Sequence, residues 1–414
     1  MIAAAQQRHS RPRQRPRRET GAAERFGGSF LREVGSGFNA GREKDKPLNT
    51  GDGRTCALVS APPSSATWRS GIRDAVCDAV TCFVAERGAD QLGMTGVEVT
   101  GDVLRSFLTG GKCLRSTFMY LGWLCGQDED PAALRAAASM ELLHAFALLQ
   151  DDVMDGSTLR RGRPAAHIAF ARWHRARGLT GSPDRFGEAA AVLLGDLCLV
   201  WAEQMLRESG VAAAALSRAW PRYDEMRTEL AVGQFADLVN DSSGFPSWDQ
   251  VLDVSRRKSG NYTVRRPLEI GAALAGCGRP VLTALGVYGE AVGEAFQMRD
   301  DLLGVFGSPA VTGKPAGVDL SEHKATSVVV SAYHLANPSL RRQLAELMGA
   351  QDLDQSDIER WRRLIAASGA VQWVEQMIDE RVCRATDGIR TPQIREPVRK
   401  ALVDMATTCT TRAA

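Results

Sequence analysis

The sequence has few aromatic residues and no stretch in which apolar and polar residues alternate, and both absences argue against an all-β protein. Aromatic residues make up 6% of the 414 residues. An excess of one charge is also missing, because 51 Lys and Arg face 49 Asp and Glu, for a net charge of +2. Nucleic-acid-binding proteins are usually strongly basic. The composition therefore predicts no nucleic-acid partner.

Zinc-type motifs and membrane-spanning runs are absent from the sequence as well. None of the nine cysteines forms a CxxC pair, and the six histidines show no HExxH spacing. Several cysteines lie in apolar stretches, so we expect reduced thiols and a cytoplasmic protein. No apolar run reaches roughly 18 residues, and Asp196 interrupts the best one, residues 189–202, so no integral membrane segment is predicted.

The first 64 residues differ from the rest in charge and pattern. Residues 1–54 hold 12 Lys or Arg against 6 Asp or Glu, and residues 8–18 are basic and rich in proline. Because neither a helical nor a strand period is present, residues 1–64 are predicted to be a disordered basic, glycine-rich extension. Three interpretations stay open: a targeting arm, a dispensable extension, and a start codon assigned too far upstream.

From residue 65 onward the pattern is that of helices. Residues 70–93, 131–155 and 186–209 place apolar side chains at intervals of three and four. Short segments rich in Gly, Pro and Asp separate these stretches. The sequence therefore predicts an all-α fold, in which residues 65–414 form one large single-domain helical bundle.

Two aspartate clusters each close an apolar helical stretch. The first consists of Asp151, Asp152 and Asp155, and the second of Asp300 and Asp301. Crowded carboxylates repel one another and lose hydration unless a cation neutralises them. Ligand sets made only of oxygen select Mg²⁺, which usually bridges carboxylates to substrate phosphates. A solvated helix end would explain either cluster alone, but two in one helical domain favour a Mg²⁺–diphosphate site.

Basic residues near glycines accompany both clusters. Lys112 and Arg115 are three residues apart, on one face of a helix expected to start there, and Lys258 is expected to open another helix. Each cation alone is typical of a solvated surface. Interleaved with the carboxylates, the set predicts two anion pockets that flank a metal cluster. The members of the set are Lys112, Arg115, Arg160, Arg161, Lys258, Lys314 and Lys324.

His144 shares a helix face with the first cluster. It lies within about 20° of Asp151 on a helical wheel, and Ala147, which lies between them along the chain, is about 40° from Asp151. Two interpretations fit this position: a histidine of the core, or a polar group on the face that carries the metal-binding carboxylates.

Five ordered blocks resemble the trans-isoprenyl diphosphate synthase (polyprenyl synthetase) family, and bacterial geranylgeranyl diphosphate synthases in particular. The blocks are GGKCLR, ELLHAFALLQDDVMD with TLRRGRP, KSGNYTVRRP, FQMRDDLLG and GKPAGVDLSEHK, and the similarity covers about residues 75–400. The resemblance implies a bundle of the isoprenoid synthase type around a deep central cavity. It also implies that the two aspartate motifs face each other at the mouth of that cavity, and that the protein is a homodimer.

The implied reaction joins isopentenyl diphosphate to an allylic diphosphate (dimethylallyl, geranyl or farnesyl diphosphate). By the resemblance, Asp151, Asp155 and Asp300 hold Mg²⁺, and Asp152 and Asp301 support them. Four cations stabilise the diphosphate as it leaves: Arg160, Lys258, Lys314 and Lys324. The resemblance assigns the isopentenyl pocket to Lys112, Arg115, His144 and Arg161. It places Ser259 and Gln297 near the allylic cation.

Five positions depart from the common family pattern. Gly304 replaces the last aspartate of the second motif, and Cys113 replaces a common arginine. The other departures are Gln150, Val318 and His323. None of them removes an aspartate expected to hold the metal, so they affect the expected substrate geometry more than the reaction class.

Product length is predicted from two residues beside the first cluster. Ala147 and Phe146 lie four and five residues before Asp151, or about 6 and 7.5 Å along the helix axis. In the resembling family, bulk at these positions limits the chain, and two aromatic residues go with a fifteen-carbon product. One aromatic and one small residue therefore predict geranylgeranyl diphosphate. The alternatives are a farnesyl or longer-chain synthase, a class I terpene cyclase and a non-catalytic subunit of a heteromeric synthase.

Overall fold

The structure is a computed structural model that describes residues 66–93, 97–108, 110–241, 245–308 and 317–411. The predicted extension, residues 1–64, and the predicted site residue Lys314 lie outside the described residues. The boundary expected at residue 65 therefore stays a prediction.

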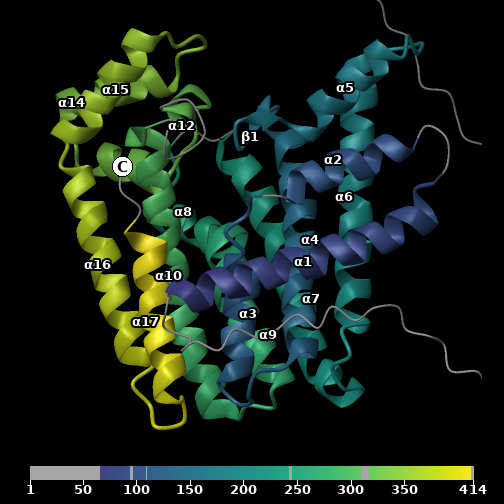
Figure 1. Ribbon diagram of the computed structural model, residues 1–414. Coiled ribbons are helices and arrows are strands. Elements are labelled where there is room, and N and C mark those ends of the chain that lie inside the picture. The colour runs from purple at the N-terminus through teal and green to yellow at the C-terminus, as the bar shows by residue number, and fades with distance from the viewer. Residues whose placement is uncertain (1–65, 94–96, 109, 242–244, 309–316, 412–414) are drawn as a thin grey trace, which may run out of the picture. The chain divides into compact units, whose positions relative to one another are not determined.

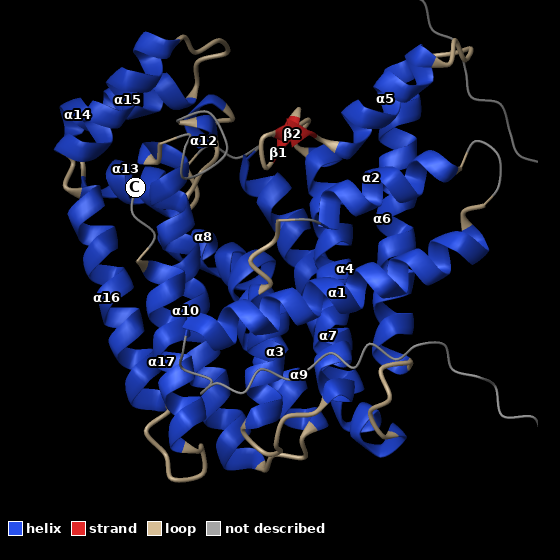
Figure 2. Cartoon of the chain, viewed as in Figure 1, coloured by secondary structure: helices blue, strands red, loops and turns tan. Residues whose placement is uncertain are grey.

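The described residues are 79% helical with almost no strand, so the predicted all-α fold is confirmed (Figure 2). The first helices are α1 (Ala66–Gln91), α2 (Glu98–Leu108), α3 (Leu114–Leu124), α4 (Pro131–Met154), α5 (Ala166–Ala176), α6 (Pro183–Arg207) and α7 (Ala213–Asp241). They are followed by α8 (Trp248–Ser255), the π-helix η1 (Arg256–Arg265), α9 (Arg266–Leu274), α10 (Arg279–Phe306) and α12 (Val318–Ser321). The last are α13 (Ser327–Leu335), α14 (Pro338–Met348), α15 (Gln355–Ala367), α16 (Ala370–Gly388) and α17 (Glu396–Thr410).

Helix α4 is the core helix that delivers the first aspartate cluster. The Asp130 side chain caps its first turn by accepting from the Ala132 amide at 2.7 Å, and Pro131 fits the first helical position. By length and composition alone, α4 and α6 could cross a membrane, but the most apolar window of α4 is 61% buried and that of α6 44% buried. The two helices pack along each other, and α4 also packs against α1 and α3.

Helix α10 carries the second aspartate cluster and belongs to both buried apolar clusters of the fold. Its first half packs in the larger cluster with α1, α3, α4, α6 and α9, and its second half in a smaller one with α13 to α16. Figure 1 shows α16 and α17 beside α10, in agreement with the packing of these helices. This packing fixes the position of α10 in the bundle, and with it the positions of Asp300 and Asp301.

A glycine contact brings α10 against the segment that carries Lys258. An added Cβ on Gly293 would lie 2.6 Å from the Gly260 Cα, so the two backbones touch where neither residue has a side chain. The expectation that Lys258 opens a helix is wrong, because α8, η1 and α9 follow one another without a break. Lys258 instead lies in the wide π-helical turns, a distortion that often occurs at functional sites.

A two-residue β-hairpin interrupts the helices directly after α4. Strand β1 (Leu159–Arg160) pairs antiparallel with β2 (Arg163–Pro164). The turn residues Arg161 and Gly162 have φ of 52° and 73°, which is the type I′ pattern of tight hairpins. No strand was expected here, since two residues are too short for an alternating pattern. The hairpin turns Arg160 back toward the end of α4.

Candidate active site

A cavity of about 1710 Å³ opens among the ends of α4, α7, η1 and α10 and the loop before α3. It brings together fourteen of the predicted site residues. These are Lys112, Arg115, His144, Phe146, Ala147, Asp151, Arg160, Arg161, Lys258, Ser259, Gln297, Asp300, Asp301 and Lys324. Asp152 and Asp155, which were also predicted, are not among the residues that line it.

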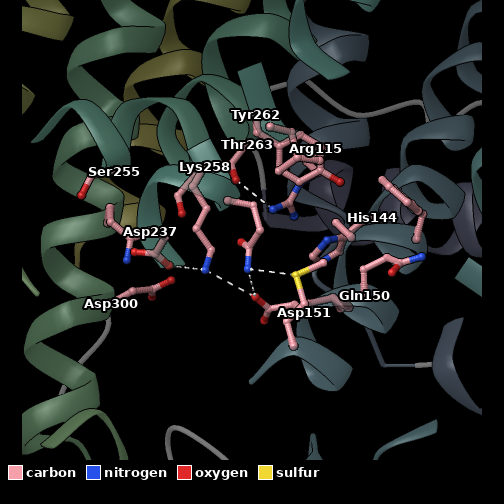
Figure 3. A pocket seen from close by; sticks show the side chains of 18 of the residues that line it. Arg115, His144, Gln150, Asp151, Asp237, Ser255, Lys258, Tyr262, Thr263 and Asp300 are labelled. Atoms are coloured by element: carbon pink, nitrogen blue, oxygen red, sulfur yellow. Dashed lines mark hydrogen bonds and ion pairs between the residues drawn. The ribbon is translucent and has the colours of Figure 1, made fainter. Parts of the chain in front are cut away.

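Asp151 lies at the carboxyl end of α4, where the helix dipole makes a negative charge unfavourable. Lys258 compensates for it, with Nζ 3.4 Å from Asp151 Oδ1 and 2.6 Å from Asp237 Oδ2 on α7 (Figure 3). Burial alone would raise the pKa of Asp151, but Lys258, Arg160 and Lys324 together lower it below its usual value. Asp151 is therefore an ionised carboxylate that faces the cavity.

Asp152 is fully buried and holds Arg160. The Arg160 Nε donates to Asp152 Oδ1 at 2.8 Å, and Nη2 donates to Asp151 Oδ2 at 3.3 Å. Burial raises the pKa of Asp152 although Arg160 opposes the shift. Asp152 is thus placed to orient the arginine, while Arg160 reaches the cavity and Asp151.

Asp155 forms the carboxyl-terminal cap of α4 and pairs with Lys324. The distance from Lys324 Nζ to Asp155 Oδ2 is 2.9 Å, and a second carboxylate, Glu322, lies 3.0 Å from the same nitrogen. Burial disfavours the charge on Lys324, but both carboxylates raise the pKa of the lysine well above its usual range. Each aspartate of the first cluster thus has a cation of the predicted set as its partner.

The two carboxylates of the second cluster both line the cavity, but they differ in burial. Asp301 is buried, and its Oδ2 accepts from the Ser327 amide at 2.9 Å and from the Ser327 hydroxyl at 2.5 Å. Gln297 Nε2 donates to the other oxygen at 2.7 Å. Burial raises the pKa of Asp301 against these hydrogen bonds. Asp300 is half-buried and lines the cavity on the side of Asp237 (Figure 3).

Gly304 follows Asp301 by three residues, in the position where the family pattern has a third aspartate. An added Cβ at this glycine would overlap the carboxylate of Asp319, which lies on α12. Asp319 also lines the cavity. The departure at position 304 therefore leaves room for a carboxylate that comes from another element of the chain.

Arg115 is held from η1 at the other side of the cavity. Its Nη2 donates to Thr263 Oγ1 at 2.9 Å, and its guanidinium stacks over the Tyr262 ring at 4.3 Å from the ring centre. The Tyr262 hydroxyl in turn donates to the Leu143 carbonyl at 3.1 Å. The sequence reasoning missed Tyr262 and Thr263 as positioning residues, although both stand one turn after Lys258 in the same block.

Lys112 and Arg115 were expected on one face of a starting helix, and the structure corrects this. Helix α3 begins only at Leu114, and Cys113 before it has a left-handed backbone with φ of 49°. Lys112 therefore belongs to the loop and Arg115 to the helix, yet both line the cavity.

His144 faces this second group of cations. Burial and the charges of Arg115, Arg161 and Arg160 hold its pKa well below the usual value. The ring is therefore neutral at pH 7. Its Nδ1 is buried without a hydrogen-bond partner within the described part of the chain. A buried polar atom of this kind favours a site that a ligand completes.

Comparison with known proteins identifies the family of this chain. The polyprenyl synthetase family model matches residues 97–365. The chain belongs to the polyprenyl synthetase family. In keeping with its family, it is a trans-prenyltransferase.

Several relatives show how close the similarity is. A crystal structure of geranylgeranyl pyrophosphate synthase from Corynebacterium glutamicum, complexed with isoprenyl diphosphate and magnesium, is 36% identical, with a TM-score of 0.79 over 83% of this chain and 99% of that one. Geranylfarnesyl diphosphate synthase from Aeropyrum pernix is 32% identical over 72% of this chain and 89% of its own length. Geranylgeranyl diphosphate synthase from Mycobacterium tuberculosis is 32% identical over 69% and 78%. Relatives of equal identity are thus named for different products.

The carboxylates of this polyprenyl synthetase are of the type that binds Mg²⁺, but they are too few in one place to hold the ion alone. Among the described residues, no three Asp, Glu, His or Cys side chains converge into a group that could hold a metal ion by itself. The cavity carboxylates of both clusters are nonetheless hard oxygen donors, the ligand type that Mg²⁺ prefers. Mg²⁺ keeps several waters and shares phosphate oxygens with its protein ligands. Asp151 and Asp300 would therefore hold a metal ion together with a bound diphosphate, and not by themselves.

Proposed function

We propose that this trans-prenyltransferase condenses isopentenyl diphosphate with an allylic diphosphate in a Mg²⁺-dependent reaction, and that its main product is geranylgeranyl diphosphate. One observation carries the proposal: a single cavity holds carboxylates from α4 and α10 together with two separate groups of cations. One group consists of Arg160, Lys258 and Lys324, and the other of Lys112, Arg115 and Arg161.

The allylic diphosphate fits beside the carboxylates. Asp151 and Asp300 would hold Mg²⁺ there, with Asp155 and Asp319 next to them. The bound metal would neutralise charge on the leaving diphosphate. In the described structure, Lys258, Lys324 and Arg160 are ion-paired with aspartates. A diphosphate with its metal gives those cations and carboxylates new partners, so the same cations can stabilise the charge that develops on the departing oxygens.

Isopentenyl diphosphate fits the group that contains Arg115. This diphosphate does not leave during the reaction, so its pocket needs cations and no metal ligands. The neutral His144 adds a hydrogen-bonding group without adding charge. The double bond of isopentenyl diphosphate attacks the allylic cation, and the departing diphosphate is placed to accept the proton that is lost. No side-chain nucleophile is required for these steps.

Product length is proposed from Phe146 and Ala147. A helical wheel places Ala147 under Asp151 but turns Phe146 away from it. Both side chains nevertheless line the cavity, and both pack at the edge of the apolar core. In our proposal, the bulk of Phe146 narrows the apolar part of the cavity, whereas the small Ala147 side chain leaves space under Asp151. This combination supports a twenty-carbon product over a fifteen-carbon one.

We infer that two copies of the chain pair through α6 and α7. Each helix presents exposed apolar side chains outside the cavity lining: Leu193 (68% exposed) and Val200 on α6, and Val239 (51% exposed) on α7. Soluble monomers seldom leave such helix faces open to water. Val200→Glu should yield a monomer in analytical ultracentrifugation. Val403→Glu, an exposed apolar position on α17, should leave the dimer intact.

We place the enzyme in the cytoplasm. Eight cysteines are described, and none of these eight forms a disulfide. Free thiols are what a reducing compartment maintains.

Incubation with isopentenyl diphosphate and each allylic primer tests the proposed reaction. Chains should lengthen only when Mg²⁺ is added, and the product should remain a diphosphate until phosphatase releases the alcohol. A free hydrocarbon would indicate a terpene cyclase instead. Unchanged substrates with every primer would indicate a non-catalytic subunit.

A further inference from the structure

Two cysteines from distant parts of the chain touch beside the cavity. The sulfur atoms of Cys77 on α1 and Cys113 before α3 are 3.8 Å apart, within hydrogen-bonding distance. Cys113 is buried and lines the cavity, whereas Cys77 is half-buried and lies outside the lining. The proposed prenyl-transfer reaction uses neither thiol.

The backbone around Cys113 links this contact to substrate binding. Cys113 stands between Lys112 and Arg115, and its left-handed φ of 49° is uncommon for a residue with a side chain. Its carbonyl accepts from the Thr117 amide at 2.9 Å and from the Thr117 hydroxyl at 2.8 Å. A displacement of the Cys113 side chain would therefore also move the first turn of α3 and the loop before it.

We propose that Cys77 and Cys113 are an oxidative modification site, and that a disulfide between them weakens binding of isopentenyl diphosphate. The second half of this statement rests on the proposed function, which assigns Lys112 and Arg115 to that substrate. The two sulfur atoms of a disulfide are about 2.05 Å apart, so the separation between these two sulfurs must shrink by about 1.8 Å. That movement ties α1 to the loop and displaces the two cations from their places in the cavity.

The chemistry balances with a peroxide as the oxidant. The Cys77 sulfur attacks one oxygen of hydrogen peroxide, the O–O bond breaks, and a sulfenic acid and one water form. The Cys113 sulfur then attacks the sulfenic sulfur, the S–S bond forms, the S–O bond breaks, and a second water leaves. The two thiols lose two electrons and the peroxide gains them.

The surroundings favour Cys77 as the first sulfur to react. A hydrogen bond from the Cys113 thiol lowers the pKa of Cys77 to about 7, and Arg73 adds to the shift, while burial, Glu141 and Asp74 oppose it. The thiolate is the reactive form, so Cys77 is partly reactive at neutral pH. Cys113 stands ready as the partner that resolves the sulfenic acid.

Peptide mapping by mass spectrometry tests the crosslink on the full chain. Treatment with hydrogen peroxide should join the peptides of Cys77 and Cys113 with loss of two hydrogens, and dithiothreitol should reverse it. In the same sample, KM for isopentenyl diphosphate should rise by about tenfold or more, the scale expected when a binding group moves by an ångström or so, while KM for the allylic substrate changes far less.

Matched variants separate this site from general oxidation. Cys77→Ser should keep the basal rate of the reduced enzyme and lose both the crosslink and the change in KM. Cys82→Ser, an exposed cysteine on the same helix, should keep both responses. The proposal is overturned if the crosslink does not form, or if it forms and KM for isopentenyl diphosphate stays the same. A failed pocket assignment shows separately, because Arg115→Ala would then leave that KM unchanged even though the crosslink forms.

Discussion

The Asp319 carboxylate occupies the space in which a side chain at position 304 would stand. Gly304 ends the second aspartate motif, and Asp319 comes from α12, fifteen residues further along the chain. The sequence motif lacks its last aspartate at position 304. In the folded chain, the Asp319 carboxylate lies where the side chain of that aspartate would start. The pair Gly304 and Asp319 is therefore one unit in our account of the metal site.

A double-mutant cycle tests that unit. Gly304→Ala should lower turnover by about tenfold or more, because the added Cβ overlaps the Asp319 carboxylate and displaces it. Asp319→Ala should lower turnover as well and weaken Mg²⁺ binding in titration calorimetry with a substrate analogue. The double variant should be no worse than Asp319→Ala alone. Simple addition of the two losses would show that Gly304 acts independently of Asp319.

Removal of an aspartate that faces the cavity tests the metal assignment. Asp151→Ala should lower turnover by at least about 10²-fold, the scale for losing one strong electrostatic contact to the transition state. Circular dichroism should show an unchanged fold. Asp379→Ala, an exposed aspartate on α16, is the matched control and should be close to wild type. A nearly normal rate for Asp151→Ala would rule out our assignment of the metal ligands.

The two groups of cations should separate in steady-state kinetics. Arg115→Ala should raise KM for isopentenyl diphosphate far more than KM for the allylic substrate, because Arg115 stands on the side away from Asp151. Lys258→Ala should do the reverse or lower kcat. Arg115→Lys keeps the charge but loses the planar group that stacks on Tyr262, so it should recover only part of the loss. Equal effects of both alanine variants on both substrates would contradict a two-pocket cavity.

His144 should make the folded state less stable in mild acid. Its folded pKa is depressed by burial and by three arginines, so below about pH 6.5 the unfolded chain binds a proton that the folded chain does not. The free energy of unfolding of the wild type, relative to His144→Gln, should therefore fall by roughly 1.4 kcal/mol per pH unit below that value. Urea unfolding at pH 7.5 and 5.5 measures the difference, with exposed His334→Gln as the control. An unchanged difference would mean that His144 is protonated in the folded protein.

Much of the fold was predictable because α-helices repeat a local pattern. The apolar period of residues 131–155 predicted α4, and the aspartates at its end predicted where a cation was needed. The hairpin at Arg160 and the π-helical course around Lys258 were missed. Two residues per strand carry no period, and a π-helix differs from an α-helix only in hydrogen-bond offset, which local sequence barely encodes.

The site residues were easier to name than to place. The sequence identified Asp152 and Asp155 as members of a charged cluster, but it could not show that they pair with Arg160 and Lys324 and lie outside the cavity lining. Contacts such as Tyr262 on Arg115 depend on the crossing of α3 with η1. No residue near Arg115 in the sequence signals that crossing.

The length of the product tests the central claim most directly. The dephosphorylated products of the wild-type enzyme should be mainly geranylgeraniol by chromatography against standards. Ala147→Phe should shift them toward farnesol by filling the space under Asp151, and Phe146→Ala should permit longer alcohols. Farnesol as the main wild-type product, or no change of length in either variant, would contradict the account.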